Sequence, residues 1–127
     1  MSHFTRLQTR LVQRHHVVQA LQDLGYDVRQ GGVEIQGYMG TRTAVDFKVP
    51  SGTPGYDIGF RQEGDGYEVV ADWWGIKDLP QEVFLQRLTQ RYAYCAVRRQ
   101  LEEQGFTLVG EEQTAEEGLR LTLRRVV

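Results

Sequence analysis

The sequence predicts a single α+β domain over residues 1–127, built from an antiparallel sheet of short strands and two helices. The length of 127 residues is typical of one domain. Several short β-rich segments follow one another with turn residues and no helix between them, which is typical of an antiparallel meander. Two segments with helical periodicity flank this run, and we expect the longer helix to pack across one face of the sheet.

The composition is that of a globular protein, with 40% hydrophobic and 25% charged residues. The net charge of −2 and the pI near 5.9 argue against a general polyanion binder. Cys95 is the only cysteine, so an intramolecular disulfide is excluded. The first residues lack a signal-peptide pattern, and no apolar run reaches the roughly 20 residues that span a bilayer. We therefore expect a cytoplasmic protein with no membrane partner.

The N-terminal part predicts a strand followed by a helix. Residues 3–11 alternate as a strand does, and their threonines favour it, although the spacing of Phe4, Leu7 and Leu11 leaves a helix open. Helical periodicity begins near Arg14, and Gly25 is a natural C-terminal stop. The buried stripe of this helix is expected to be Val17, Val18, Leu21 and Leu24.

The meander follows directly. Its strands are predicted at Tyr26–Gln30, Val33–Tyr38, Thr43–Val49, Tyr56–Gln62 and Tyr67–Trp74. We interpret Gly31-Gly32 as a turn and Glu63-Gly64-Asp65-Gly66 as a tight hairpin.

A long helix is predicted from Pro80 to about Gln104, with Gly105 ending it. Two further strands, Phe106–Gly110 and Leu119–Val126, are expected after it, joined by the acidic loop 111–118. We expect the helix to cover the sheet face that bears Val45, Phe47, Ile58, Phe60, Val69 and Ala71.

Strand alternation places Asp46, Asp57 and Asp72 on the opposite sheet face. Three carboxylates there could hold a hard cation. Basic residues on the same face favour an ordinary charge-paired surface instead. Val70 and Trp74 share this face, which indicates that another element or a partner covers part of it.

Arginines form two further candidate sites. Arg91 lies beside Tyr92 and Tyr94 on the long helix, and an unpaired buried guanidinium is costly, so we expect it to pair with Asp57 or Asp72. This pairing needs a bulge or strand end, because parity places the aspartates on the other face. A pocket for an anionic ligand is the alternative. If the first and last strands pair, four arginines gather on one face, namely Arg6, Arg10, Arg120 and Arg124.

Among the remaining reactive side chains we predict no catalytic residue, and we expect no metal or cofactor. His3, His15 and His16 lack ligand spacing, and Cys95 shares an apolar helix face that is typical of an inert thiol. The glycines form no phosphate-binding loop. Strand alternation directs Trp73 into the main core and Trp74 to the opposite face of the sheet. An exposed aromatic residue there is typical of an interface. The candidate binding residues are Trp74, Arg91, Asp57, Asp72 and Tyr94.

Four blocks of the sequence carry a family resemblance. They are Ser2-His3-Phe4, Tyr56-Asp57-Ile58-Gly59-Phe60, Glu68-Val69-Val70-Ala71-Asp72 and Gln90-Arg91-Tyr92-Ala93-Tyr94. Over nearly the whole chain the sequence resembles the cyanobacterial and plastid family called hypothetical chloroplast open reading frame thirty-five. The resemblance implies a small protein without an agreed activity, associated with genes for AAA-type ATPases and ferredoxin-like proteins. Cys95 departs from the family, which has a histidine there.

Three functions remain open from the sequence. The first is a non-enzymatic binding or adaptor protein with a protein partner, serving an ATPase or a photosynthetic assembly process. The second is a small enzyme or metal protein using Asp46, Asp57 and Asp72. The third is a nucleic-acid binder using the arginine face. We expect the first, which an exposed aromatic patch around Trp73-Trp74 would favour. The sequence does not predict the oligomeric state.

Overall fold

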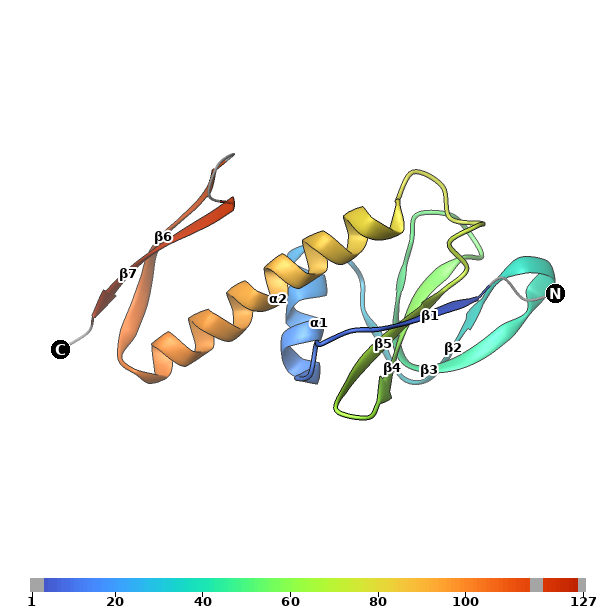
Figure 1. Ribbon diagram of the computed structural model, residues 1–127, viewed down its shortest axis with the longest axis horizontal. Helices are drawn as coiled ribbons and strands as arrows, with labels where there is room; N and C mark the ends of the chain where they lie inside the picture. Colours follow the sequence, from blue (N-terminus) through green and yellow to red (C-terminus); the bar gives the residue numbers. More distant parts are fainter. Residues whose placement is uncertain (1–3, 115–117, 126–127) are drawn as a thin grey trace. The chain divides into compact units, whose positions relative to one another are not determined.

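A computed structural model describes residues 4–114 and 118–125 (Figure 1). The chain divides into two compact units, Met1–Tyr92 and Ala93–Val127, and one long helix runs from the first into the second. In chain order the elements are β1 (Thr5–Gln8), α1 (Arg14–Asp23), β2 (Arg29–Gln36), the short 3-10 turn η1 (Tyr38–Gly40), β3 (Arg42–Pro50), β4 (Asp57–Glu63), β5 (Gly66–Ala71), α2 (Gln81–Glu103), β6 (Phe106–Thr114) and β7 (Gly118–Arg125).

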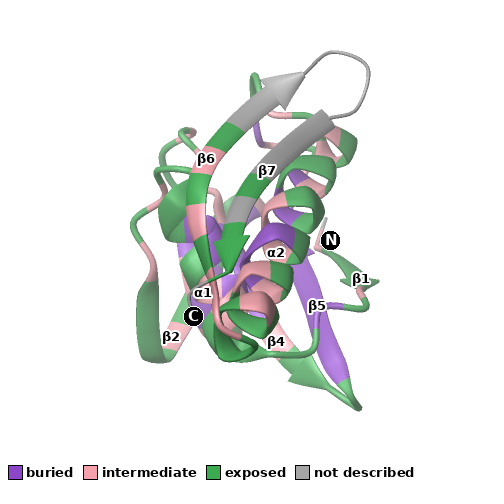
Figure 2. Cartoon of the chain, turned by 90° about the vertical axis from the view of Figure 1, so that its left-hand side faces the viewer, coloured by how far each residue is buried: buried purple, intermediate pink, exposed green. Residues whose placement is uncertain are grey.

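The first unit contains a five-stranded antiparallel sheet in the order β1-β5-β4-β3-β2. Strands β2 to β5 form the predicted meander, and β1 adds to the free edge of β5. Figure 2 shows that β5 is buried along its length, whereas β1 at the edge is exposed. The predicted α+β class is confirmed.

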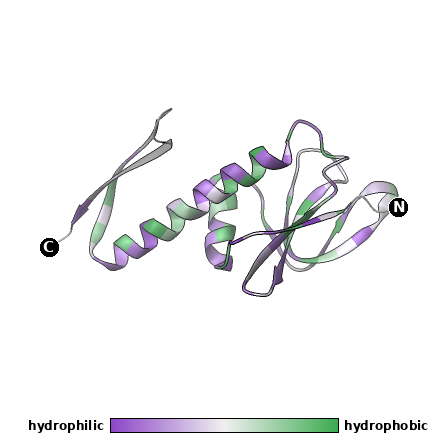
Figure 3. Ribbon diagram, in the orientation of Figure 1, coloured by the Kyte–Doolittle hydropathy of each residue, from purple (hydrophilic) through white to green (hydrophobic). Residues whose placement is uncertain are grey.

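The helix ends follow the predicted signals. Gly25, with a φ of 92°, ends α1 as the backbone N–H of Tyr26 donates to the carbonyl of Leu21 at 3.0 Å. Pro80 precedes α2, and its carbonyl accepts the first helical hydrogen bond from Phe84 at 3.1 Å. Along α2 hydrophobic and hydrophilic residues alternate, as expected of a helix with one buried side (Figure 3). In α1, Val17 and Leu21 are buried as expected, but Leu24 is exposed.

Three predicted strands have the wrong bounds. Gly31 and Gly32 both have positive φ and form a bulge rather than a turn, so the expected strands Tyr26–Gln30 and Val33–Tyr38 are replaced by the single strand β2. Strand β5 ends at Ala71, and both tryptophans lie in the turn after it. The hairpin at Gly64-Asp65 is confirmed, with Glu63 opposite Gly66.

The main core lies on the sheet face that bears Phe47 and Phe60, whose rings stack at 5.0 Å. Phe84 of α2 contacts Phe60 and Trp73, with ring centroids 6.3 and 5.7 Å away. The guanidinium of Arg14, at the start of α1, lies over the Phe47 ring at 5.2 Å. Both helices therefore contribute to the core on this one face, as predicted for α2.

A second, smaller core lies on the other face of the sheet. It consists of Ile35, Val45 and Val70, with Phe4 and Val33 packed against it. The prediction that Val45 joins Phe47 in the main core was wrong, and the strand pairing shows why. The β3–β4 ladder ends at the pair Phe47 and Phe60, so β3 diverges from β4 before Val45.

Two side-chain features accompany this divergence. The Oδ2 of Asp46 accepts a hydrogen bond from the backbone N–H of Gln62 at 2.6 Å, beyond the end of the β3–β4 ladder. A Cβ at Gly59 would lie 2.5 Å from Val45 Cγ1, so only glycine fits there without movement. The expectation that another element covers part of this face is confirmed by the residues of β2 and β3 packed around Val70.

The second unit holds the C-terminal part of α2 and the two-stranded antiparallel sheet of β6 and β7. Strand β6 extends beyond the predicted Gly110 to Thr114, and β7 begins and ends one residue earlier than predicted. Residues 115–117 of the expected acidic loop lie outside the described residues. Within the described ranges, no helix is long and apolar enough to cross a membrane.

Candidate functional site

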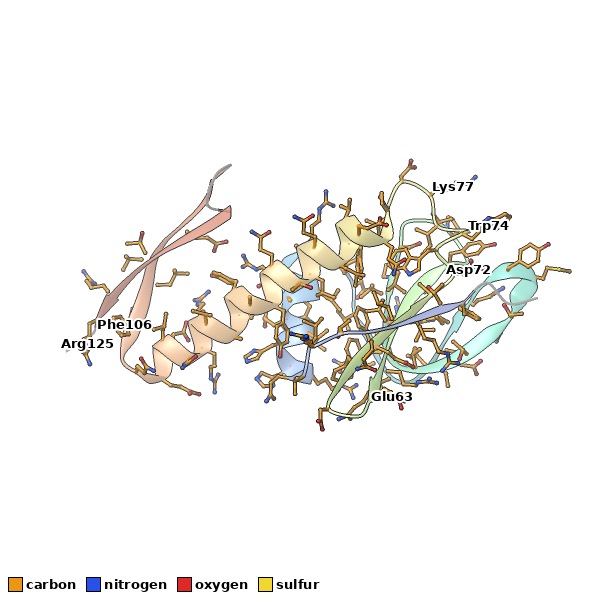
Figure 4. All side chains as sticks on the ribbon, viewed as in Figure 1. Glu63, Asp72, Trp74, Lys77, Phe106 and Arg125 are labelled. Carbon is orange, nitrogen blue, oxygen red and sulfur yellow. The ribbon has the colours of Figure 1, made fainter. Side chains whose placement is uncertain are left out.

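The five predicted binding residues separate into different environments. Asp72 and Trp74 lie together at one end of the first unit's sheet, opposite the end that carries Glu63 (Figure 4). Arg91, Asp57 and Tyr94 each interact elsewhere. The candidate site is therefore built around Asp72 and Trp74.

The predicted partner of Arg91 was wrong. Its Nε donates to Oδ2 of Asp23 at 2.9 Å, and both side chains are 22% exposed. Asp23 is the last residue of α1, so the ion pair joins the two helices rather than α2 and the sheet. Strand alternation correctly argued against Asp57 and Asp72 as partners. The partner carboxylate lies on a helix, whose residues strand alternation does not describe.

The three aspartates of the proposed cation site have separate partners. Asp57 pairs with Lys48 at 3.2 Å, and Asp46 accepts the N–H of Gln62. Asp72 accepts the N–H of Tyr38. Across residues 4–114 and 118–125, no group of three or more His, Cys, Asp or Glu side chains is placed to hold a metal ion.

The predicted four-arginine face does not form. Strand β1 pairs with β5, and β7 pairs with β6 in a different sheet, so the first and last strands do not pair with each other. Arg6 instead lies 3.6 Å from Glu68, which also accepts a hydrogen bond from Arg61.

Tyr94 and Cys95 are both buried. The hydroxyl of Tyr94 accepts a hydrogen bond from Arg98 at 3.1 Å, and Arg98 also donates to Glu102 at 2.6 Å. These two hydrogen bonds, first the one to Glu102 and then the one to Tyr94, raise the pKa of Arg98. Tyr94 thus has a role within its own helix, and burial of Cys95 agrees with the expected inert thiol.

Asp72 is a buried carboxylate that fixes a loop. It is only 1% exposed, and its Oδ2 accepts the backbone N–H of Tyr38 at 2.9 Å. The neighbouring Gly37 is tightly packed: an added Cβ would lie 3.0 Å from the Phe4 ring and 3.2 Å from Asp72 Cβ, so a neighbour would have to move by a few tenths of an ångström. The β2–β3 connection is therefore held close to the end of β5.

Trp74 and Met39 are large hydrophobic side chains that this end of the sheet leaves exposed. Trp74 is 75% exposed, and its ring meets that of Tyr38 edge to face at 6.1 Å. Met39, the next residue in the β2–β3 connection, is 82% exposed and has a φ of 55°, a conformation that non-glycine residues rarely adopt. We call Tyr38, Met39 and Trp74 the aromatic patch.

The loop that carries Trp74 is anchored directly after it. Ile76 is buried, and the N–H of Lys77 donates to Thr53 Oγ1 at 2.9 Å. Gly75 lies so close to the Tyr56 ring that a Cβ would clash with it. Trp74 is therefore exposed on a fixed turn, which is the arrangement of a preorganised binding residue.

Sequence reasoning missed Tyr38 and Met39. The signal available was an aromatic and an apolar residue directly before Gly40, in a connection between two strands where polar turn residues are usual. Their position beside Trp74 depends on the hydrogen bond from Tyr38 to Asp72, between residues 34 positions apart.

Comparison with known proteins places the chain in a family. Residues 20–122 match the family described as "Protein of unknown function (DUF1257)". The chain is 34% identical to "Uncharacterized protein ycf35" of Guillardia theta over 131 aligned residues and 32% identical to that of Cyanophora paradoxa over 127, with 98% of each chain covered. No solved structure matches. These relatives confirm the resemblance to hypothetical chloroplast open reading frame thirty-five, and the chain belongs to the DUF1257 family.

Proposed function

We propose that this chain is a non-enzymatic binding or adaptor protein that contacts a protein partner through the aromatic patch. The observation that carries the proposal is the exposure of Trp74 on an anchored turn. Exposed tryptophans and tyrosines are enriched among the residues that dominate binding energy, because they bury a large area with little loss of conformational entropy. A turn that is already fixed lowers the entropy cost of binding further.

The proposal assigns no catalytic residue, metal or cofactor. Asp72, the buried carboxylate of the site, holds the Tyr38 loop, and we give it a positioning role. Cys95 is buried and is the only cysteine of the sequence, so the fold needs no oxidising compartment, and we propose the cytoplasm as part of the same proposal.

The family resemblance suggests which class of protein the partner belongs to. It associates the family with AAA-type ATPases, so we propose an accessory role for such an ATPase or for a photosynthetic assembly process. The printed names of the relatives state neither role, and the aromatic patch supports only the general class of protein partner.

Affinity capture with matched variants tests the proposal. Tagged wild type, Trp74→Ala and Val12→Ala are incubated with lysate of the organism that encodes the chain. Val12 is also exposed, at 49%, but lies outside the aromatic patch. We expect proteins that wild type and Val12→Ala retain to be lost with Trp74→Ala. Identical sets of proteins on all three baits would contradict the proposal.

A further inference from the structure

Two unpaired cations flank the aromatic patch. Lys77 follows Trp74 by three residues, and Arg42 follows Met39 by three residues, so each Cα lies within about 11 Å of its neighbour in the patch. Figure 4 shows Lys77 and Trp74 projecting from the same loop. Both cations are exposed, and within residues 4–114 and 118–125 neither forms an ion pair or a side-chain hydrogen bond.

Several other cations of the first unit are paired. Lys48 pairs with Asp57, Arg91 pairs with Asp23, and Arg61 donates to Glu68. The charges beside the aromatic patch are thus left available at a position where they would meet a partner.

A recess opens beside Lys77. It has a volume of about 430 Å³, and its walls are the 51–54 loop and the segment Lys77 to Leu79, with Tyr26 between them. Within the described residues the hydroxyl of Tyr26 forms no hydrogen bond. Burial raises the pKa of Tyr26, so this hydroxyl stays protonated and can donate to an acceptor. A lysine and a phenolic donor at one recess suit a carboxylate.

One carboxylate of the chain lies in the same wall. Asp78 lines the recess and is exposed. It is the chain neighbour of Lys77 and lies three residues before Gln81, the first residue of α2. Within the described residues Asp78 forms no ion pair with Lys77, and Arg42 has no carboxylate partner either.

We infer that the partner of the aromatic patch is a protein segment with an apolar side chain for Trp74 and an adjacent Asp or Glu for Lys77 and Arg42. This inference rests on the proposed function and adds the charge of the partner to it. In such an interface the aromatic residue supplies most of the affinity, while the charges at the rim set the association rate, the salt dependence and the choice of partner.

Selection from a random-peptide display library on the immobilised full chain tests the inference. Peptides enriched on wild type are expected to carry an aromatic or large aliphatic residue beside Asp or Glu. A synthetic copy of the best peptide should bind the Lys77→Glu/Arg42→Glu variant about tenfold more weakly at low salt, with a smaller difference at high salt. Asp78→Asn should tighten binding. Both reversed side chains are exposed and unpaired, so the variant is expected to keep its melting temperature.

The outcomes separate the two claims. Peptides that need Trp74 but show no acidic preference, or bind the charge-reversed variant equally well, would overturn the inference and leave the proposed function standing. If no enriched peptide loses binding in Trp74→Ala, the proposed function fails and the inference fails with it.

Discussion

The backbone N–H of Tyr38 donates a hydrogen bond to Oδ2 of Asp72 at 2.9 Å, although the two residues are 34 positions apart. Through this contact a buried side chain after β5 fixes the loop between β2 and β3. The Tyr38 ring then lies against Trp74 at 6.1 Å. The aromatic patch is consequently a product of the tertiary fold.

Replacing Asp72 tests this contact. Asp72→Ala leaves the N–H of Tyr38 without its acceptor and should lower the free energy of unfolding by about 1–3 kcal/mol. Asp72→Asn keeps a carbonyl oxygen of the same shape and removes a buried charge, so we expect it to cost less than about 1 kcal/mol. Urea denaturation measures both, and amide hydrogen exchange at Tyr38 should accelerate only in Asp72→Ala. Equal costs for the two variants would show that the hydrogen bond does not position the loop.

The ion pair between Arg91 and Asp23 should contribute more than a fully exposed pair. A double-mutant cycle with Arg91→Ala and Asp23→Ala is expected to give a coupling energy of about 1 kcal/mol, because both side chains are 22% exposed. The matched control is Arg99 and Glu103 on α2, where both side chains are 66% exposed and the coupling should stay below about 0.5 kcal/mol. If the two coupling energies are the same, the α1–α2 ion pair has no special role in the first unit.

The close contact between Gly59 and Val45 predicts that a smaller residue at position 45 reduces the cost of a side chain at position 59. Gly59→Ala places a Cβ 2.5 Å from Val45 Cγ1 and should destabilise the fold by about 1–3 kcal/mol through overpacking. The same substitution should cost less in a Val45→Ala background, where space has been made. Gly110→Ala is the control, because its Cβ would meet Thr122 at an ordinary 3.5 Å. An unchanged cost of Gly59→Ala in both backgrounds would refute the packing of the second core.

The raised pKa of Tyr26 predicts that the fold loses stability at high pH. Burial raises its pKa above the ordinary value of 10.0, and the positive charge of Arg87 lowers it in part. Since the folded pKa exceeds the unfolded one, the contribution of Tyr26 is complete below pH 10.0 and is lost as the pH rises through the folded pKa. Tyr26→Phe should flatten the decline of unfolding free energy in this range. Arg87→Gln should raise the Tyr26 pKa further, as measured by NMR titration of the ring, and a fall in that pKa would contradict the assignment.

Local signals predicted much of the fold. Gly25 and Gly105 end their helices as expected, and the Glu63–Gly66 hairpin forms because the Gly64-Asp65 turn brings its flanking residues opposite each other. Gly31 was harder to interpret, since positive φ suits a bulge as well as a turn. Only pairing with β3 distinguishes the two.

Features that depend on contacts between distant parts of the chain could not be predicted from the sequence. Alternation assumes that a strand keeps its neighbours, so it could not place Val45 once β3 diverges from β4. It likewise gave no partner for Arg91, because the position of Asp23 depends on how two helices pack. The predicted exposure of Trp74 is confirmed. Its contact with the Tyr38 ring could not be predicted, because it depends on the tertiary fold.

The affinity of a captured partner for wild type and for Trp74→Ala, measured together with the melting temperature of both, tests the central claim most directly. We expect the substitution to weaken binding about thirtyfold, corresponding to about 2 kcal/mol for an aromatic residue central to an interface. The melting temperature should change by no more than about 3 °C, because Trp74 is 75% exposed. Unchanged affinity together with a large fall in melting temperature would show that Trp74 stabilises the fold and does not bind a partner.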